Sequence, residues 1–87
     1  MSDLSSKLHE EIEALQRLRD ELRVQANLGA KEARDLWTEA EQKWEQIEHS
    51  AGELRQASAE SGREIAAALG LLADSLREAY RSLRAKL

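Results

Sequence analysis

The chain has 87 residues, a formal net charge of −4 and neither cysteine nor proline. This length allows one small domain, and the lack of cysteine excludes disulfides and thiolate chemistry. Nucleic-acid binding usually needs a basic face, which the finely mixed charges do not provide, so nucleic acid is not an expected partner. Charged residues make up 34% of the chain, and Ala, Glu, Leu, Arg and Gln dominate, which is typical of a long helix or coiled coil.

Apolar or small residues recur every three or four positions along most of the chain. From Leu15 to Leu87 there are 20 such steps over 72 residues, a mean step of 3.6. This is the period of an α-helix, and the mixture of seven- and eleven-residue groupings predicts a nearly straight helix. We therefore expect an all-α fold in which residues 1–87 form a single helical coiled-coil unit, a near-continuous amphipathic helix. The residues predicted to form its self-association seam are Leu15, Leu22, Ala26, Gly29, Ala33, Trp37, Ala40, Trp44, Ile47, Ala51, Leu54, Ile65, Leu69, Leu72, Leu76, Tyr80 and Leu83.

A single helix of this length, roughly 130 Å, cannot bury its own apolar stripe, so the pattern predicts pairing with a second copy. Trp44 is the middle residue of the 87, and an antiparallel homodimer with full overlap would place it against its own copy. In the same register the basic C-terminal segment, residues 76–87, would meet the acidic residues Asp3, Glu10 and Glu11 of the partner. The two tryptophans, Trp37 and Trp44, are then expected to fill the seam, and a membrane-interface or partner-binding role is the alternative.

A two-helix antiparallel hairpin is the alternative fold, with its turn near 49–53 or 57–62. Each region contains a potential capping box, Ser50 with Glu53 and Ser61 with Glu64. A turn near residue 51 would also set large residues against small ones. Against the hairpin, the apolar stripe keeps its helical phase through both regions, and neither contains Pro or Asn.

The C-terminal segment, residues 65–87, combines a leucine stripe with several arginines. Its longest uncharged apolar run, residues 65–73, is far too short to cross a bilayer. The segment has the character of an amphipathic helix that lies on a lipid surface, which is the alternative to a protein–protein role.

The ionisable residues do not form a recognisable catalytic or metal-binding motif. His9 with Glu13, and Glu45 with His49, are spaced to share a helix face, but two ligands do not make a structural zinc site. No nucleophile stands near a His with an orienting acid, and no Gly-rich phosphate loop is present. We therefore expect no enzyme activity, no catalytic, cofactor-binding or metal residues, and no cofactor.

Residues 21–48 and the later stretch IAAALGLLADSLREAYRSLR resemble a group of small bacterial coiled-coil proteins without an established activity, some of them loosely linked with stress responses. The resemblance implies a helical interaction protein and no catalytic residue. The expected function is a scaffold or partner-binding module whose partner is itself, as a homodimer or higher bundle, or another protein. The N-terminus has no apolar core of signal-peptide type, so a cytoplasmic location is expected.

Overall fold

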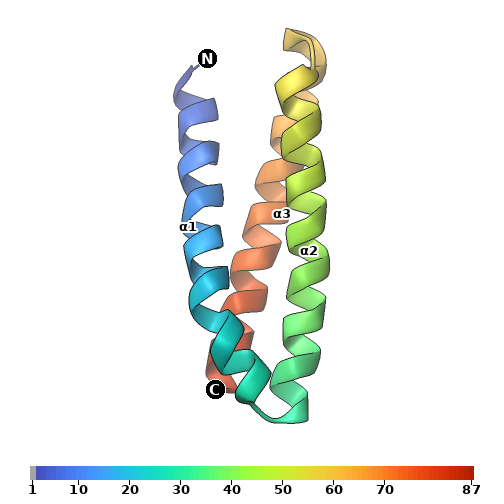
Figure 1. The fold of residues 1–87 in the computed structure, drawn as a ribbon. Coiled ribbons are helices and arrows are strands. Elements are labelled where there is room, and N and C mark those ends of the chain that lie inside the picture. The colour runs from blue at the N-terminus through green and yellow to red at the C-terminus, as the bar shows by residue number, and fades with distance from the viewer. Residues whose placement is uncertain (1) are drawn as a thin grey trace.

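The chain folds into a bundle of three α-helices in a computed structural model that describes residues 2–87, with side chains described from Ser6 onward. The helices are α1 (Ser2–Leu28), α2 (Lys31–Gln56) and α3 (Ala59–Ala85). They run down, up and down, so that α1 and α3 are parallel to each other and antiparallel to α2 (Figure 1). The prediction of an all-α fold is confirmed.

Local chemistry explains why these segments are helical. No proline interrupts them, and the abundant Ala, Leu, Glu, Arg and Gln are the strongest helix formers. Two helices also carry charges that suit the helix dipole, with Glu32 and Arg55 in the first and last turns of α2, and Glu60 and Arg84 in those of α3.

The apolar stripe is buried inside one chain. Six large side chains of the core are almost inaccessible to solvent, and no polar or charged residue among the described side chains is buried with them. The buried residues are Leu8, Leu15, Leu22, Ala26, Ala33, Ala40, Trp44, Ile47, Leu69, Ala73, Leu76, Tyr80 and Leu83.

The prediction of one near-continuous helix is wrong. The helix is interrupted at Gly29–Ala30 and again at Ala57–Ser58, and the molecule measures 44 × 19 × 16 Å instead of forming a long rod. Folding back twice lets a single chain cover its own stripe, which removes the need for a second copy to bury it. The arrangement with Trp44 on its own copy also fails, because the Trp44 side chain is only 4% exposed within the chain.

The two-helix hairpin is wrong as well, because the chain has a second turn at Gly29–Ala30. One turn does lie at Ala57–Ser58, inside the range 57–62, whereas residues 49–53 are helical. The Oγ of Ser58 caps α3 by accepting a hydrogen bond from the backbone N–H of Ser61 at 3.3 Å. The glycines at 52 and 62 both lie inside helices.

The helices do not pack equally. The pair α2 and α3 packs most extensively, α1 and α3 less so, and α1 and α2 least. Ion pairs join the outer edges of α1 and α3: Arg77 Nη2 lies 2.8 Å from Glu11 Oε2, and Arg84 Nη2 lies 3.3 Å from Glu21 Oε1. The basic C-terminal segment thus meets acidic residues of α1 within one chain, between parallel helices, whereas the prediction placed these opposite charges between two antiparallel chains.

Candidate partner-binding groove

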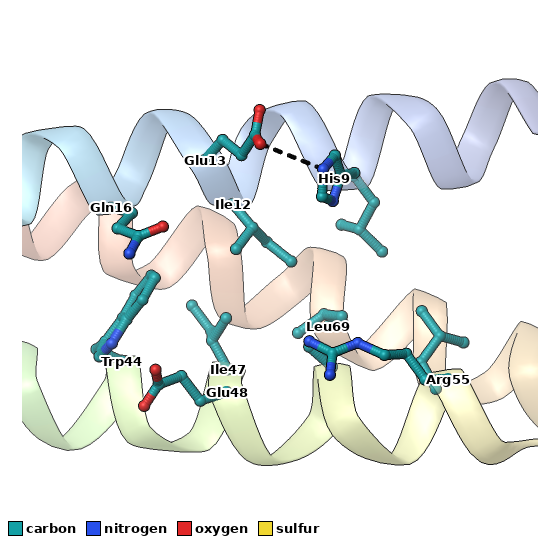
Figure 2. A pocket seen from close by; sticks show the side chains of 12 residues that line it. His9, Ile12, Glu13, Gln16, Trp44, Ile47, Glu48, Arg55 and Leu69 are labelled. Carbon is teal, nitrogen blue, oxygen red and sulfur yellow. Dashed lines mark ion pairs between the residues drawn. The ribbon is translucent and has the colours of Figure 1, made fainter.

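A groove of about 470 Å³ lies between the N-terminal half of α1 and the C-terminal half of α2, with α3 contributing to its floor. Figure 2 shows Ile12, Ile47 and Leu69 converging on it from the three helices. The groove exists because α1 packs least closely against α2, which leaves the apolar stripe incompletely covered on this side. Its apolar lining consists of Leu8, Ile12, Trp44, Ile47, Ala51, Leu54 and Leu69.

Polar side chains form the rim of the groove. On α1, His9 Nε2 lies 3.3 Å from Glu13 Oε2, and both side chains are more than half exposed. Gln16 and Glu48 lie beside Trp44 at one end, whereas Arg55 lies near Leu69 towards the other end (Figure 2). An apolar floor with a polar rim is the usual anatomy of a protein-binding surface.

Trp44 closes one end of the groove, where a charged cluster holds α1 to α2. Arg19 donates two hydrogen bonds to Glu41, from Nε to Oε2 at 2.6 Å and from Nη2 to Oε1 at 2.8 Å. The same guanidinium lies over the Trp44 ring, 5.4 Å from its centroid. The hydrogen bond to Glu41 is the main cause that raises the pKa of Arg19 above its ordinary value, against the opposing effect of burial. The cluster fixes the position of the indole at the groove end.

Tyr80 lies in the core and is 2% exposed. Its hydroxyl is buried and makes no hydrogen bond within the described part of the chain. Burial is the main cause that raises the pKa of Tyr80 well above its ordinary value, with a smaller contribution from the charge of Glu41. A small hollow of about 170 Å³ beside it is lined by Arg77, Arg81 and Arg84, but each of these arginines is already paired with a carboxylate. This hollow therefore has no free cationic group for an anion.

The sequence-predicted histidine pairs lie on the surface. His9 pairs with Glu13 as the spacing suggests, whereas His49 pairs with Glu53, at 3.4 Å, and not with Glu45. Across residues 2–87, no three His, Cys, Asp or Glu side chains gather closely enough to hold a metal ion. None of the helices in this range is long and apolar enough to cross a membrane.

The 17 residues of the predicted seam are all at least partly buried. Eleven of them are buried in the core, and Gly29, Trp37, Ala51, Leu54, Ile65 and Leu72 are half-buried. The seam thus supplies the contacts among the three helices of one chain. Sequence reasoning missed Ala73, although its spacing from Leu69 and Leu76 fits the helical period.

The groove itself was also missed. Its rim residues His9, Gln16, Glu48 and Arg55 come from two helices, and nothing in their spacing along the chain brings them together. Only the turn at Gly29–Ala30, which places α1 beside α2, creates this site.

Comparisons with protein-family models, curated proteins and solved structures find no match for the chain. The resemblance to small bacterial coiled-coil proteins, the stress association it implies and the cytoplasmic location stay predictions.

Proposed function

We propose that this protein is a helical interaction module and that the groove between α1 and α2 binds an amphipathic helix of another protein. The observation that carries this proposal is the apolar lining of the groove between two polar rims. Grooves of this kind accept the apolar face of a helix, while the rim meets its polar flanks. Within the groove, Ile12, Ala51 and Leu54 are half-buried, so they retain apolar surface that a partner helix would cover.

The charges on the rim suggest the direction of the bound helix. Arg55 suits the negative C-terminal end of a helix dipole, and Glu48, beside Trp44, suits the positive N-terminal end. We therefore expect the partner helix to begin near Trp44 and to end near Arg55.

The lipid-surface alternative loses its main support. It depended on the leucine stripe of residues 65–87, but Leu69, Leu76 and Leu83 are each 0% exposed in the bundle. Binding of a membrane through these residues would require α3 to leave the other two helices, at the cost of the whole core.

The test is selection of amphipathic helical peptides from a displayed library against the purified protein. Selected peptides should perturb the amide NMR signals of groove residues, and Ile12→Lys should weaken their binding by at least about tenfold because it places a charge on the apolar floor. The matched control is Leu71→Lys, because Leu71 is 72% exposed on α3 and does not line the groove. Peptides that bind the two variants equally well would refute the proposal.

A further inference from the structure

The turn between α1 and α2 preserves the helical phase of the apolar stripe. Leu22 and Ala26 are buried before the turn, and Ala33 and Ala40 are buried after it. Ala26 and Ala33 are seven residues apart, nearly two full helical turns, so they would share one face if the helix ran on without a break. A turn that reverses the chain has no need of this match, but a continuous helix through the turn requires it.

The chemistry of the turn is close to that of a helix. Its two residues are Gly29 and Ala30, and no residue in the described backbone has a positive φ. Ala30 has φ −67° and ψ 168°, so its φ is already helical and ψ alone must rotate to continue the helix through it. Ala30 occupies the N-cap position of α2, where Ala is a poor residue, and no side chain caps the helix there.

Close packing at the turn keeps position 29 small. A Cβ placed on Gly29 would lie 3.1 Å from the Cβ of Ala33 and 3.3 Å from the carbonyl oxygen of Gln25. A side chain here would therefore crowd the closed turn, whereas in a continuous helix any residue would be more favourable than glycine except proline. A side chain at position 29 therefore disfavours the closed turn but favours a continuous helix.

The second turn is built differently. Its N-cap residue, Ser58, accepts a hydrogen bond from the backbone of Ser61, and the helices that it joins, α2 and α3, have the most extensive contact in the bundle. Of the three helices, α1 packs least extensively against the others. The turn that joins α1 to α2 also lacks a side-chain cap. If one helix leaves the closed bundle, it is α1.

We propose that two copies of this chain form a dimer by exchanging α1. In each copy residues 2–56 become one continuous helix of roughly 80 Å, and α1 packs against α2 and α3 of the partner. Exchange keeps the core packing of α1 and the ion pairs that join α1 to α2 and α3, including Arg19 with Glu41, but makes them between chains. The second copy fits the vacated site because it supplies the same helix. The predicted seam residues then form contacts between the two chains, within bundles of three helices. This inference does not depend on the groove binding a partner.

The experiment measures the monomer-to-dimer ratio by light scattering after unfolding and refolding at graded protein concentrations. In each copy the Gly29–Ala30 turn becomes helical, and Gly29→Ala favours this change by about fivefold from helix propensity alone. A dimer contains two such turns, so its association constant should rise roughly 25-fold. Ala30→Pro should shift the ratio towards monomer, because the proline ring matches the φ of −67° at this position and cannot lie inside a continuous helix. Gly52→Ala is the matched control, since nothing lies within 4 Å of a Cβ placed there, and it should leave the ratio unchanged.

A distance measurement separates exchange from simple docking. Labels at Lys7 and Gln56, both exposed, are at neighbouring ends of α1 and α2 in the closed bundle and about 70 Å apart along a continuous helix. In dimers of labelled chain diluted with unlabelled chain, exchange predicts the long distance within one chain. Dimers that keep the short distance would overturn the proposal. So would a Gly29→Ala protein that refolds entirely to monomer at every concentration tested.

Discussion

Arg19 and Glu41 form a two-point contact between α1 and α2, with both carboxylate oxygens of Glu41 engaged at 2.6 and 2.8 Å. Their side chains are 24% and 26% exposed, so the pair is partly shielded from water. A bidentate arginine–carboxylate pair is stronger than a single hydrogen bond. The guanidinium group also lies over the Trp44 ring. It is the main polar link between two helices that otherwise make little contact.

Replacing Arg19 should therefore loosen α1. We expect Arg19→Ala to lower the free energy of unfolding by about 1–2 kcal/mol, measured by urea denaturation followed by circular dichroism. Arg19→Lys keeps the charge but loses the fork of donors and the stacking on Trp44, so it should recover only part of this loss. The control is Asp35→Ala, which breaks the exposed pair with Lys31 and should change stability very little. Equal effects of Arg19→Ala and Asp35→Ala would show that the Arg19 contact contributes nothing special.

The buried hydroxyl of Tyr80 should make the protein sensitive to alkaline pH. Because burial raises the pKa of Tyr80 in the folded state, the unfolded chain releases this proton at lower pH than the folded chain. This contribution to stability is complete below about pH 10 and is lost as the pH rises above that value, by about 1.4 kcal/mol per unit. Tyr80 is the single tyrosine of the chain, so tyrosinate absorbance reports its ionisation directly. A midpoint at the ordinary value in the folded protein would contradict this prediction.

Tyr80→Phe tests the same group at neutral pH. The Tyr80 hydroxyl has no hydrogen-bond partner in the described chain, so its removal should leave stability unchanged or raise it by about 1 kcal/mol. The variant should also lose the part of the alkaline destabilisation that depends on Tyr80. A decrease of stability at pH 7 comparable to that of a core truncation would mean that the hydroxyl is in fact satisfied.

Small residues between α2 and α3 should resist enlargement. Ala40 on α2 and Leu76 on α3 belong to the same buried core cluster. Both Ala40 and Leu76 are 0% exposed. We expect Ala40→Leu to destabilise the bundle by about 1–3 kcal/mol, because Ala40 has no exposed surface and the added atoms must be fitted into the packed core. Ala14→Leu, at an exposed position of α1, is the control and should have almost no effect in the same denaturation experiment.

The helical period in the sequence correctly predicted many of the buried residues. It did not predict that other helices of the same chain, and not a second copy, cover them. Leu15, Ile47 and Leu69 lie on the expected stripe and are almost inaccessible. A period describes one face of a helix, however, and that face can be covered by a second copy or by another part of the same chain. The two turns were hidden because Gly29, Ala30, Ala57 and Ser58 are all tolerated in helices and the stripe stays in phase across them. The groove depends on which helix lies beside which, so it was not predictable before the turns were known.

Both turns should be more stable with serine than with alanine at the N-cap position of the helix that follows. At the α3 N-cap, Ser58→Ala removes the acceptor for the backbone N–H of Ser61 and should cost about 1 kcal/mol. At the α2 N-cap, Ala30→Ser adds an acceptor where there is none and should stabilise the closed bundle by a comparable amount. Ser75→Ala, at an exposed interior position of α3, is the control for the intrinsic preference of alanine and should be neutral or slightly stabilising. If Ala30→Ser leaves the urea midpoint unchanged while Ser58→Ala lowers it, a lack of capping does not limit the stability of the first turn. We expect Ala30→Ser to raise the urea midpoint and also to lower the dimer fraction. Both effects follow because a better cap on the closed turn stabilises the monomer and not the exchanged dimer.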